Sequence, residues 1–83
     1  MKTVHEVRVP FTCRFRRWEK DGKPRNVLAD EPICTVAYYI MPGVTRDIKA
    51  GAEGWLEIGK WIKEGDLLEI GTLIAKVRLI IGI

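Results

Sequence analysis

The stretch "WIKEGDLLEIG", residues 61–71, decides the fold because it repeats an earlier stretch, "WEKDGKPRNVL", residues 18–28. Both begin with Trp, any residue, Lys, an acidic residue and Gly. Gly65 lies in the middle of the second stretch, where glycine disfavours a helix. The shared pattern therefore predicts one non-helical structural unit that occurs twice in the chain.

The repeat extends in both directions from the shared tryptophan, with a two-residue insertion in the first copy. The equivalent apolar pairs are Cys13 and Leu56, Phe15 and Ile58, Trp18 and Trp61, Ile33 and Ile74, Cys34 and Ala75, and Val36 and Val77. The polar positions do not agree, which indicates repeated packing without shared chemistry. Because a solenoid needs at least three repeats, we expect one domain, 1–83, of two interleaved halves, about 11–40 and 54–80. The repeat also favours a core position for Trp18.

Alternation of apolar and polar residues dominates the chain and predicts strands rather than helices. In the first strand, Val7 and Val9 share one face with His5. The segments expected to be strands are 3–9, 12–18, 32–40, 45–50, 54–62 and 72–81. Turn signals rich in glycine, proline and acidic residues separate them, and Gly22, Gly43 and Gly65 are expected to have positive φ. We therefore predict an all-β domain.

Composition limits the class of protein. The chain has 83 residues, 47% hydrophobic and 30% charged, with no apolar run long enough for a membrane helix and no signal-peptide core. We therefore expect a soluble cytoplasmic protein without membrane contact. Cys13 and Cys34 are too few for a disulfide framework or a four-ligand zinc site. The sequence favours two reduced, buried cysteines, with a Cys13–Cys34 bridge as the alternative, and no metal site around the single His5.

Residues 48–77, "IKAGAEGWLEIGKWIKEGDLLEIGTLIAKV", resemble the second half of a biotinyl or lipoyl carrier domain. The family's sequence pattern, which includes K-E-G-D at the turn, is matched by Ala50, Gly54, Lys63, Glu64, Gly65, Asp66, Leu68, Gly71 and Ile74. Residues 11–40 match the partner half less closely. The resemblance implies a flattened barrel or sandwich of two halves related by a pseudo-two-fold axis, the barrel-sandwich hybrid. Asp66 should hydrogen-bond the turn, and Leu68 and Ile74 should return to the core.

The chain departs from the carrier family at the modified lysine. Carriers hold the prosthetic group on a lysine at a hairpin tip, and the tip here lies near "IMPGV", residues 40–44. No lysine occurs between Lys23 and Lys49, and Lys49 and Lys76 belong to strands. The sequence therefore predicts no cofactor at the tip. Since no nucleophile–base pair, phosphate loop or metal spacing is present either, we expect no enzyme activity.

Two features remain as candidate partner-binding sites. The first is basic: residues 1–25 carry eight basic and three acidic side chains, a net +5, whereas residues 26–83 carry −2. The second is the uncharged tip, 37–43, which either projects as an apolar patch for a partner or folds against the barrel as part of the core. The candidate residues are Arg14, Arg16, Arg17, Lys23, Arg25, Tyr38, Tyr39 and Met41. Arginine beside aromatic residues suits both protein interfaces and nucleic acids, and a solvated strand face is the third interpretation.

Three functions follow from these features. The first is a non-catalytic protein-binding module, such as an accessory subunit, assembly factor or small inhibitor. The second is a nucleic-acid-binding protein that uses the basic N-terminal strand. The third is a divergent carrier modified on an unexpected lysine. In addition, the apolar C-terminal stretch "RLIIGI", 78–83, is expected to lie in a last strand of the monomer or, failing that, to pair with a second copy as an edge strand.

Overall fold

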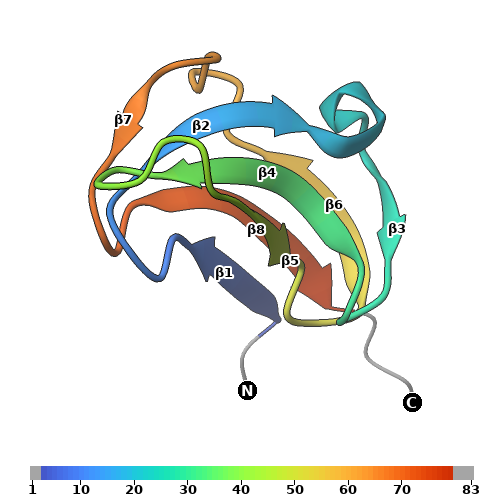
Figure 1. Cartoon of the computed structure of the whole chain (residues 1–83). Coiled ribbons are helices and arrows are strands. Elements are labelled where there is room, and N and C mark those ends of the chain that lie inside the picture. The colour runs from blue at the N-terminus through green and yellow to red at the C-terminus, as the bar shows by residue number, and fades with distance from the viewer. Residues whose placement is uncertain (1–2, 80–83) are drawn as a thin grey trace.

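Residues 3–79 are described in the computed structural model, and their strands form two four-stranded antiparallel sheets (Figure 1). The elements are β1 (Val4–Arg8), β2 (Cys13–Trp18), the 3-10 helix η1 (Glu19–Gly22), β3 (Arg25–Val27), β4 (Pro32–Tyr38), β5 (Thr45–Lys49), β6 (Gly54–Ile58), β7 (Leu67–Leu68) and β8 (Leu73–Leu79). The prediction of an all-β domain is confirmed. Over the described residues, the two sheets remain separate and do not close into a barrel.

The two sheets have equivalent strand orders. One is β1-β8-β6-β3 and the other is β5-β4-β2-β7. Exchanging β2 with β6, β3 with β7, β4 with β8 and β5 with β1 converts one order into the other. The short strands β3 and β7 each pair with a strand from the other part of the chain, β6 and β2 respectively. Each sheet therefore combines strands from both parts of the sequence.

The core lies between the two sheets and follows the alternation of the sequence. In β2, Cys13 and Phe15 are buried while Arg14 and Arg16 are exposed, as the period of two predicts. The largest fully buried side chains are Ile33, Leu56, Leu68, Ile74, Val9, Val27, Val36, Val77, Cys13 and Cys34. Leu68 and Ile74 were expected to return to the core after the turn at Gly65. Both are buried, so this prediction is confirmed.

The strand predicted for 54–62 is too long, and for this reason the two repeat tryptophans lie in different environments. The strand predicted for 54–62 ends at Ile58, after which the chain turns, with Ile62 N donating to Gly59 O at 3.1 Å. Trp61 therefore lies on a turn and is 58% exposed, while Ile62 takes the buried position. Trp18 is still on its strand, packs against the core and tilts over Phe15, with ring centroids 4.9 Å apart. The two repeat tryptophans thus differ in environment.

The turn before β7 has the predicted chemistry. Gly65 has φ +88°, which a side chain would strain, and the Asp66 carboxylate accepts a hydrogen bond from Lys63 N at 2.9 Å. Gly22 also has positive φ, at +69°, but the prediction for Gly43 is wrong, since it is not among the positive-φ residues. Its hairpin turn has Pro42 at the second position and Gly43 at the third, where a type I turn needs negative φ.

The two cysteines are buried and free, so the favoured interpretation is confirmed and the bridge is absent. Burial raises the pKa of Cys34 to about 12, with smaller contributions from Cys13 and two carboxylates. Burial also raises the pKa of Cys13. Both thiols are therefore held in the neutral form, which is the unreactive form.

This burial predicts how stability depends on alkaline pH. The unfolded chain ionises the Cys34 thiol near its ordinary value of 9.0, whereas the folded chain keeps it protonated until about 12. The contribution of Cys34 to the free energy of unfolding is therefore constant below pH 9 and falls between pH 9 and 12. Urea midpoints measured across this range should fall less steeply in Cys34→Ala than in the wild type. Identical slopes in both proteins would contradict this assignment.

Of the two expectations for the C-terminal stretch, its described part follows the first, because Arg78 and Leu79 belong to the last strand, β8. Strand β8 lies inside its sheet, paired with β1 on one side and β6 on the other, so through Leu79 it has no open edge. The remainder of that prediction, residues 80–83, lies outside the described residues. The edges of the sheets are instead β1, β3, β5 and β7. No helix within residues 3–79 is long and apolar enough to cross a membrane.

Candidate interaction surface

The β4–β5 hairpin forms a tip at one end of the molecule (Figure 1). Tyr38 N donates to Val44 O at 3.0 Å, and Val44 N donates to Met41 O at 2.9 Å, so the chain reverses over residues 41–44. Residues 36–45 contain no charge. The hairpin therefore carries an uncharged tip on a hydrogen-bonded frame.

The tip residues point into solvent. Ile40 is 81% exposed, and Tyr39 and Met41 are each 52% exposed. Leu67 and Ile70 are exposed at the same end, because β7 joins the same sheet and Ile70 N donates to Thr12 Oγ1 at 3.2 Å. We call this the apolar tip surface, made of Tyr39, Ile40, Met41, Val44, Leu67 and Ile70. Such clustering of exposed apolar side chains is typical of interaction sites.

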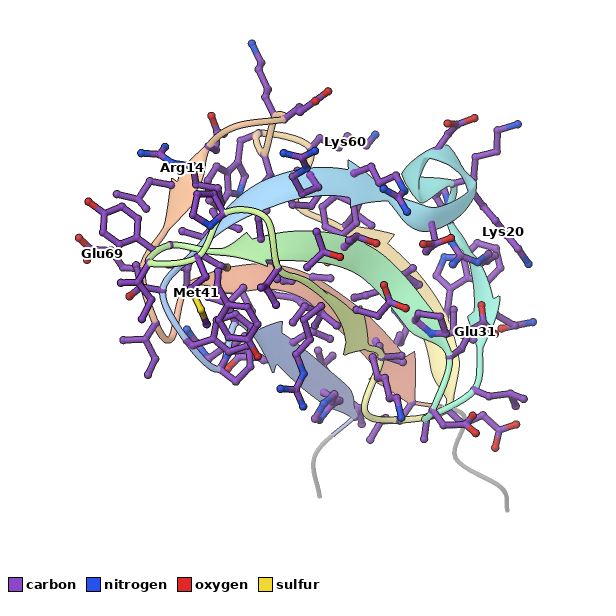
Figure 2. All side chains as sticks on the ribbon, in the orientation of Figure 1. Arg14, Lys20, Glu31, Met41, Lys60 and Glu69 are labelled. Atoms are coloured by element: carbon purple, nitrogen blue, oxygen red, sulfur yellow. The ribbon has the colours of Figure 1, made fainter. Side chains whose placement is uncertain are left out.

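Arg14 connects the two parts of this surface. Its guanidinium lies over the Tyr39 ring, 5.8 Å from the centroid, and donates to Gly65 O at 3.1 Å. On the sheet it stands between Ala37 of β4 and Leu67 of β7. Figure 2 shows Arg14, Met41 and Glu69 at one end of the molecule. The structure therefore brings one predicted arginine to the predicted tip.

The other predicted basic residues are not gathered at the tip. Arg16 and Arg17 are exposed further along β2. Lys23 is exposed in the loop before β3, and β3 belongs to the opposite sheet. Arg25 is half-buried on β3, where its Nε lies 3.3 Å from the Glu31 carboxylate. The predicted basic set is therefore divided between the two sheets, and one member is already in an ion pair.

Tyr38 differs from the other predicted tip residues. Its ring stacks on Phe11, with centroids 4.5 Å apart and planes 12° apart. Its hydroxyl accepts a hydrogen bond from Arg46 Nη1 at 2.9 Å. Tyr38 is half-buried and supports the base of the hairpin, whereas Tyr39 and Met41 form the accessible part.

Leu67 and Ile70 were not predicted from the sequence as surface residues. Leu67 stands beside Leu68, and a strand directs only one of two neighbours inward, so one of the pair had to face solvent. Ile70 stands in the turn signal "EIGT", where an apolar residue has no strand to place it in the core. Neither signal, however, says that these residues lie beside the hairpin, because that depends on the pairing of β7 with β2.

The described residues carry no arrangement for metal binding at this end. No group of three His, Cys, Asp or Glu side chains that could hold a metal ion occurs within residues 3–79. Neither of the two strand lysines considered from the sequence lies at the tip: Lys49 is at the end of β5, and Lys76 is within β8. The apolar tip surface therefore offers contact area and one cation, and no reactive group.

Comparison with protein-family models, with curated proteins and with solved structures finds no match to this chain.

Proposed function

We propose that the chain is a non-catalytic protein-binding module that uses the apolar tip surface. The observation that carries this proposal is the exposure of four uncharged side chains, Tyr39, Ile40, Met41 and Val44, on one hairpin. Covering a large apolar side chain contributes about 1.5–3 kcal/mol. A partner that covers the hairpin therefore gains free energy that offsets part of the cost of association.

The composition of the surface favours a protein partner. Aromatic residues, Met and Arg are enriched in protein interfaces, and the strongest contributions usually come from aromatic and arginine side chains. Tyr39 and Arg14 provide both and already contact each other. Since the hairpin itself has no charge, phosphate groups and charged metabolites have little to bind there.

We further propose that the scaffold is biotinyl/lipoyl-like, without a prosthetic group. Two observations support this proposal. The two strand orders interconvert when the two parts of the chain are exchanged. In addition, the exposed hairpin lies where the resemblance places the modified lysine of carriers, yet it has none. Intact mass of the protein from its native host tests the alternative of a divergent carrier, since an added biotinyl or lipoyl mass would overturn this part.

The roles that fit the proposal are an accessory subunit, an assembly factor or a small inhibitor. The test uses the immobilised chain and extract of the native host, followed by titration of any recovered protein. The proposal requires saturable binding that survives moderate salt, because burial of apolar side chains is weakly screened. Recovery of no specific protein would contradict it.

Nucleic-acid binding is the second candidate, favoured by the exposed arginines of β2. Because Arg25 is paired and Lys23 lies in the loop before β3, a strand of the other sheet, we expect no retention of single- or double-stranded probes, even at about 50 mM salt. Gel-shift titration tests this expectation. Salt-dependent binding that is lost in a variant with both Arg14→Glu and Arg16→Glu would support this second function instead.

A further inference from the structure

Strands β1 and β5 are edge strands of the two sheets (Figure 1), and a cleft lies between them. Its volume is about 670 Å³, and both strands line it. Val7 and Ile48 are buried residues in its lining, and Phe11 lies beside them. The cleft therefore has apolar side chains between two strand edges.

Both edges present backbone groups to this cleft. Thr3, just before β1, accepts a hydrogen bond from Leu79 N, so its carbonyl faces β8. Val44, just before β5, accepts one from Tyr38 N, so its carbonyl faces β4. Along an antiparallel strand, successive residues direct their backbone N–H and C=O groups to opposite sides. Every second residue of β1 and β5 therefore directs these groups away from its own sheet. The residues that direct N–H and C=O groups away from their own sheet are Val4, Glu6, Arg8, Thr45, Asp47 and Lys49. Unpaired edges of this kind accept an additional strand.

The charges of the cleft favour an acidic occupant. Glu6 is paired with Arg8 at 3.0 Å, and Asp47 accepts a hydrogen bond from a threonine hydroxyl of β4 at 3.0 Å. Arg46 and Lys49 also line the cleft, and within residues 3–79 neither has a carboxylate at ion-pair distance. Both cations lie on β5, Arg46 on the face that carries the apolar Ile48 and Lys49 on the opposite face. A carboxylate on the occupant would therefore complete the charge balance.

We propose that this cleft binds an extended acidic segment of a partner polypeptide as an added strand between β1 and β5. Each of these strands has five residues, so the occupied length is about 17 Å, or about five residues of partner. Apolar side chains on one face of the segment pack on Val7 and Ile48, while a carboxylate on its other face meets Lys49. The occupant differs from that of the apolar tip surface, and the inference stands independently of it.

The test uses a synthetic nine-residue peptide in which glutamate and valine alternate, with both ends blocked. Titration into isotope-labelled protein should shift the backbone amides of β1 and β5, with saturation below about 1 mM. A peptide with lysine in place of glutamate should bind at least about tenfold more weakly, because it meets Lys49 with like charge. A peptide with alternate backbone amides methylated should also lose binding at least about tenfold, since it cannot donate to the strand edges.

Variants of the protein separate the backbone from the side chains. Glu6→Pro removes a donor that faces the cleft and leaves the pairing with β8 intact, because proline is tolerated at the free side of an edge strand. It should weaken the peptide at least about fivefold. Glu6→Ala keeps the donor and should not weaken it. Met41→Asp should leave peptide binding unchanged. If Glu6→Pro does not fold, the methylated peptide still tests the hydrogen bonds.

Several results would overturn the proposal. One is the absence of amide shifts in β1 and β5 up to about 1 mM peptide. Others are equal affinity for the methylated peptide, equal affinity for the lysine peptide, or shifts confined to the apolar tip surface. Shifts of the β1 and β5 amides that depend on protein concentration without peptide would assign the cleft to a second copy of this chain instead.

Discussion

Replacing Met41 with Asp is expected to weaken binding of the protein partner by at least about tenfold, which is about 1.4 kcal/mol. Met41 is half-exposed on the hairpin, between the highly exposed Ile40 and Pro42. In a complex the new carboxylate would be buried against apolar side chains, and an unpaired buried charge is costly. Because the side chain faces solvent in the free protein, the free energy of unfolding should change by less than about 0.5 kcal/mol.

Leu28→Asp is the matched control for this prediction. Leu28 is 57% exposed and lies between β3 and β4, away from the hairpin tip. The same change of chemistry there should leave the affinity unchanged, when both variants are compared by titration calorimetry with the recovered partner. Equal loss in the two variants would show a general effect of charge, and no loss in Met41→Asp would remove the tip from the interface.

Replacing Gly54 with Ala is expected to destabilise the fold by at least about 3 kcal/mol, or to prevent folding. A Cβ at this position would clash with the backbone carbonyl oxygen of Arg78 on the paired strand β8 and would meet the Val77 side chain at 3.0 Å. A backbone atom inside a sheet cannot move aside as a flexible side chain can. Since a domain of this size has roughly 5–10 kcal/mol of stability, this one methyl group should remove a large part of it.

Gly43→Ala provides the contrast for Gly54→Ala. No atom lies within 4 Å of the position that its Cβ would take, and Gly43 does not have positive φ. The substitution should leave stability unchanged or raise it by about 0.4–1 kcal/mol, because the unfolded chain loses conformational freedom. Urea denaturation of the three proteins measures both effects. Similar stability of the two variants would contradict the described pairing of β6 with β8.

The long strands could be predicted from the sequence because they follow one physical rule. Where one face of a strand is buried, the alternation is visible, as in the buried Cys13 and Phe15 between exposed arginines. Strands β3 and β7 were missed because they have three and two residues and cannot show a period. Their pairing with the other part of the chain is a tertiary contact that no local pattern records.

The same distinction explains the two tryptophans. The repeat aligned Trp18 with Trp61 correctly in sequence, but an aligned position does not fix the environment. Strand β2 continues through Trp18. Strand β6, in contrast, ends at Ile58, and the turn that begins at Gly59 places Trp61 outside the sheet, where it is exposed. Equivalent positions in the repeat therefore have different backbone conformations.

The candidate site was predicted in part. The uncharged, lysine-free stretch at residues 40–44 indicated where to look, and the structure exposes Ile40 and Met41 there. The sequence could not place Arg14 over Tyr39, because that contact depends on the register between β2 and β4. It also could not separate Arg25 from the other arginines, since the ion pair with Glu31 forms only in the folded chain.

The most direct test of protein binding through the apolar tip surface is a footprint of backbone amides in the complex with the recovered partner. The proposal predicts that the strongest protection from exchange appears in residues 39–44 and 67–70, with smaller changes at Arg14. The outer half of β2, around Arg16 and Arg17, should exchange as in the free protein. Protection confined to those arginines, with the amides of residues 39–44 unchanged, would contradict the proposal.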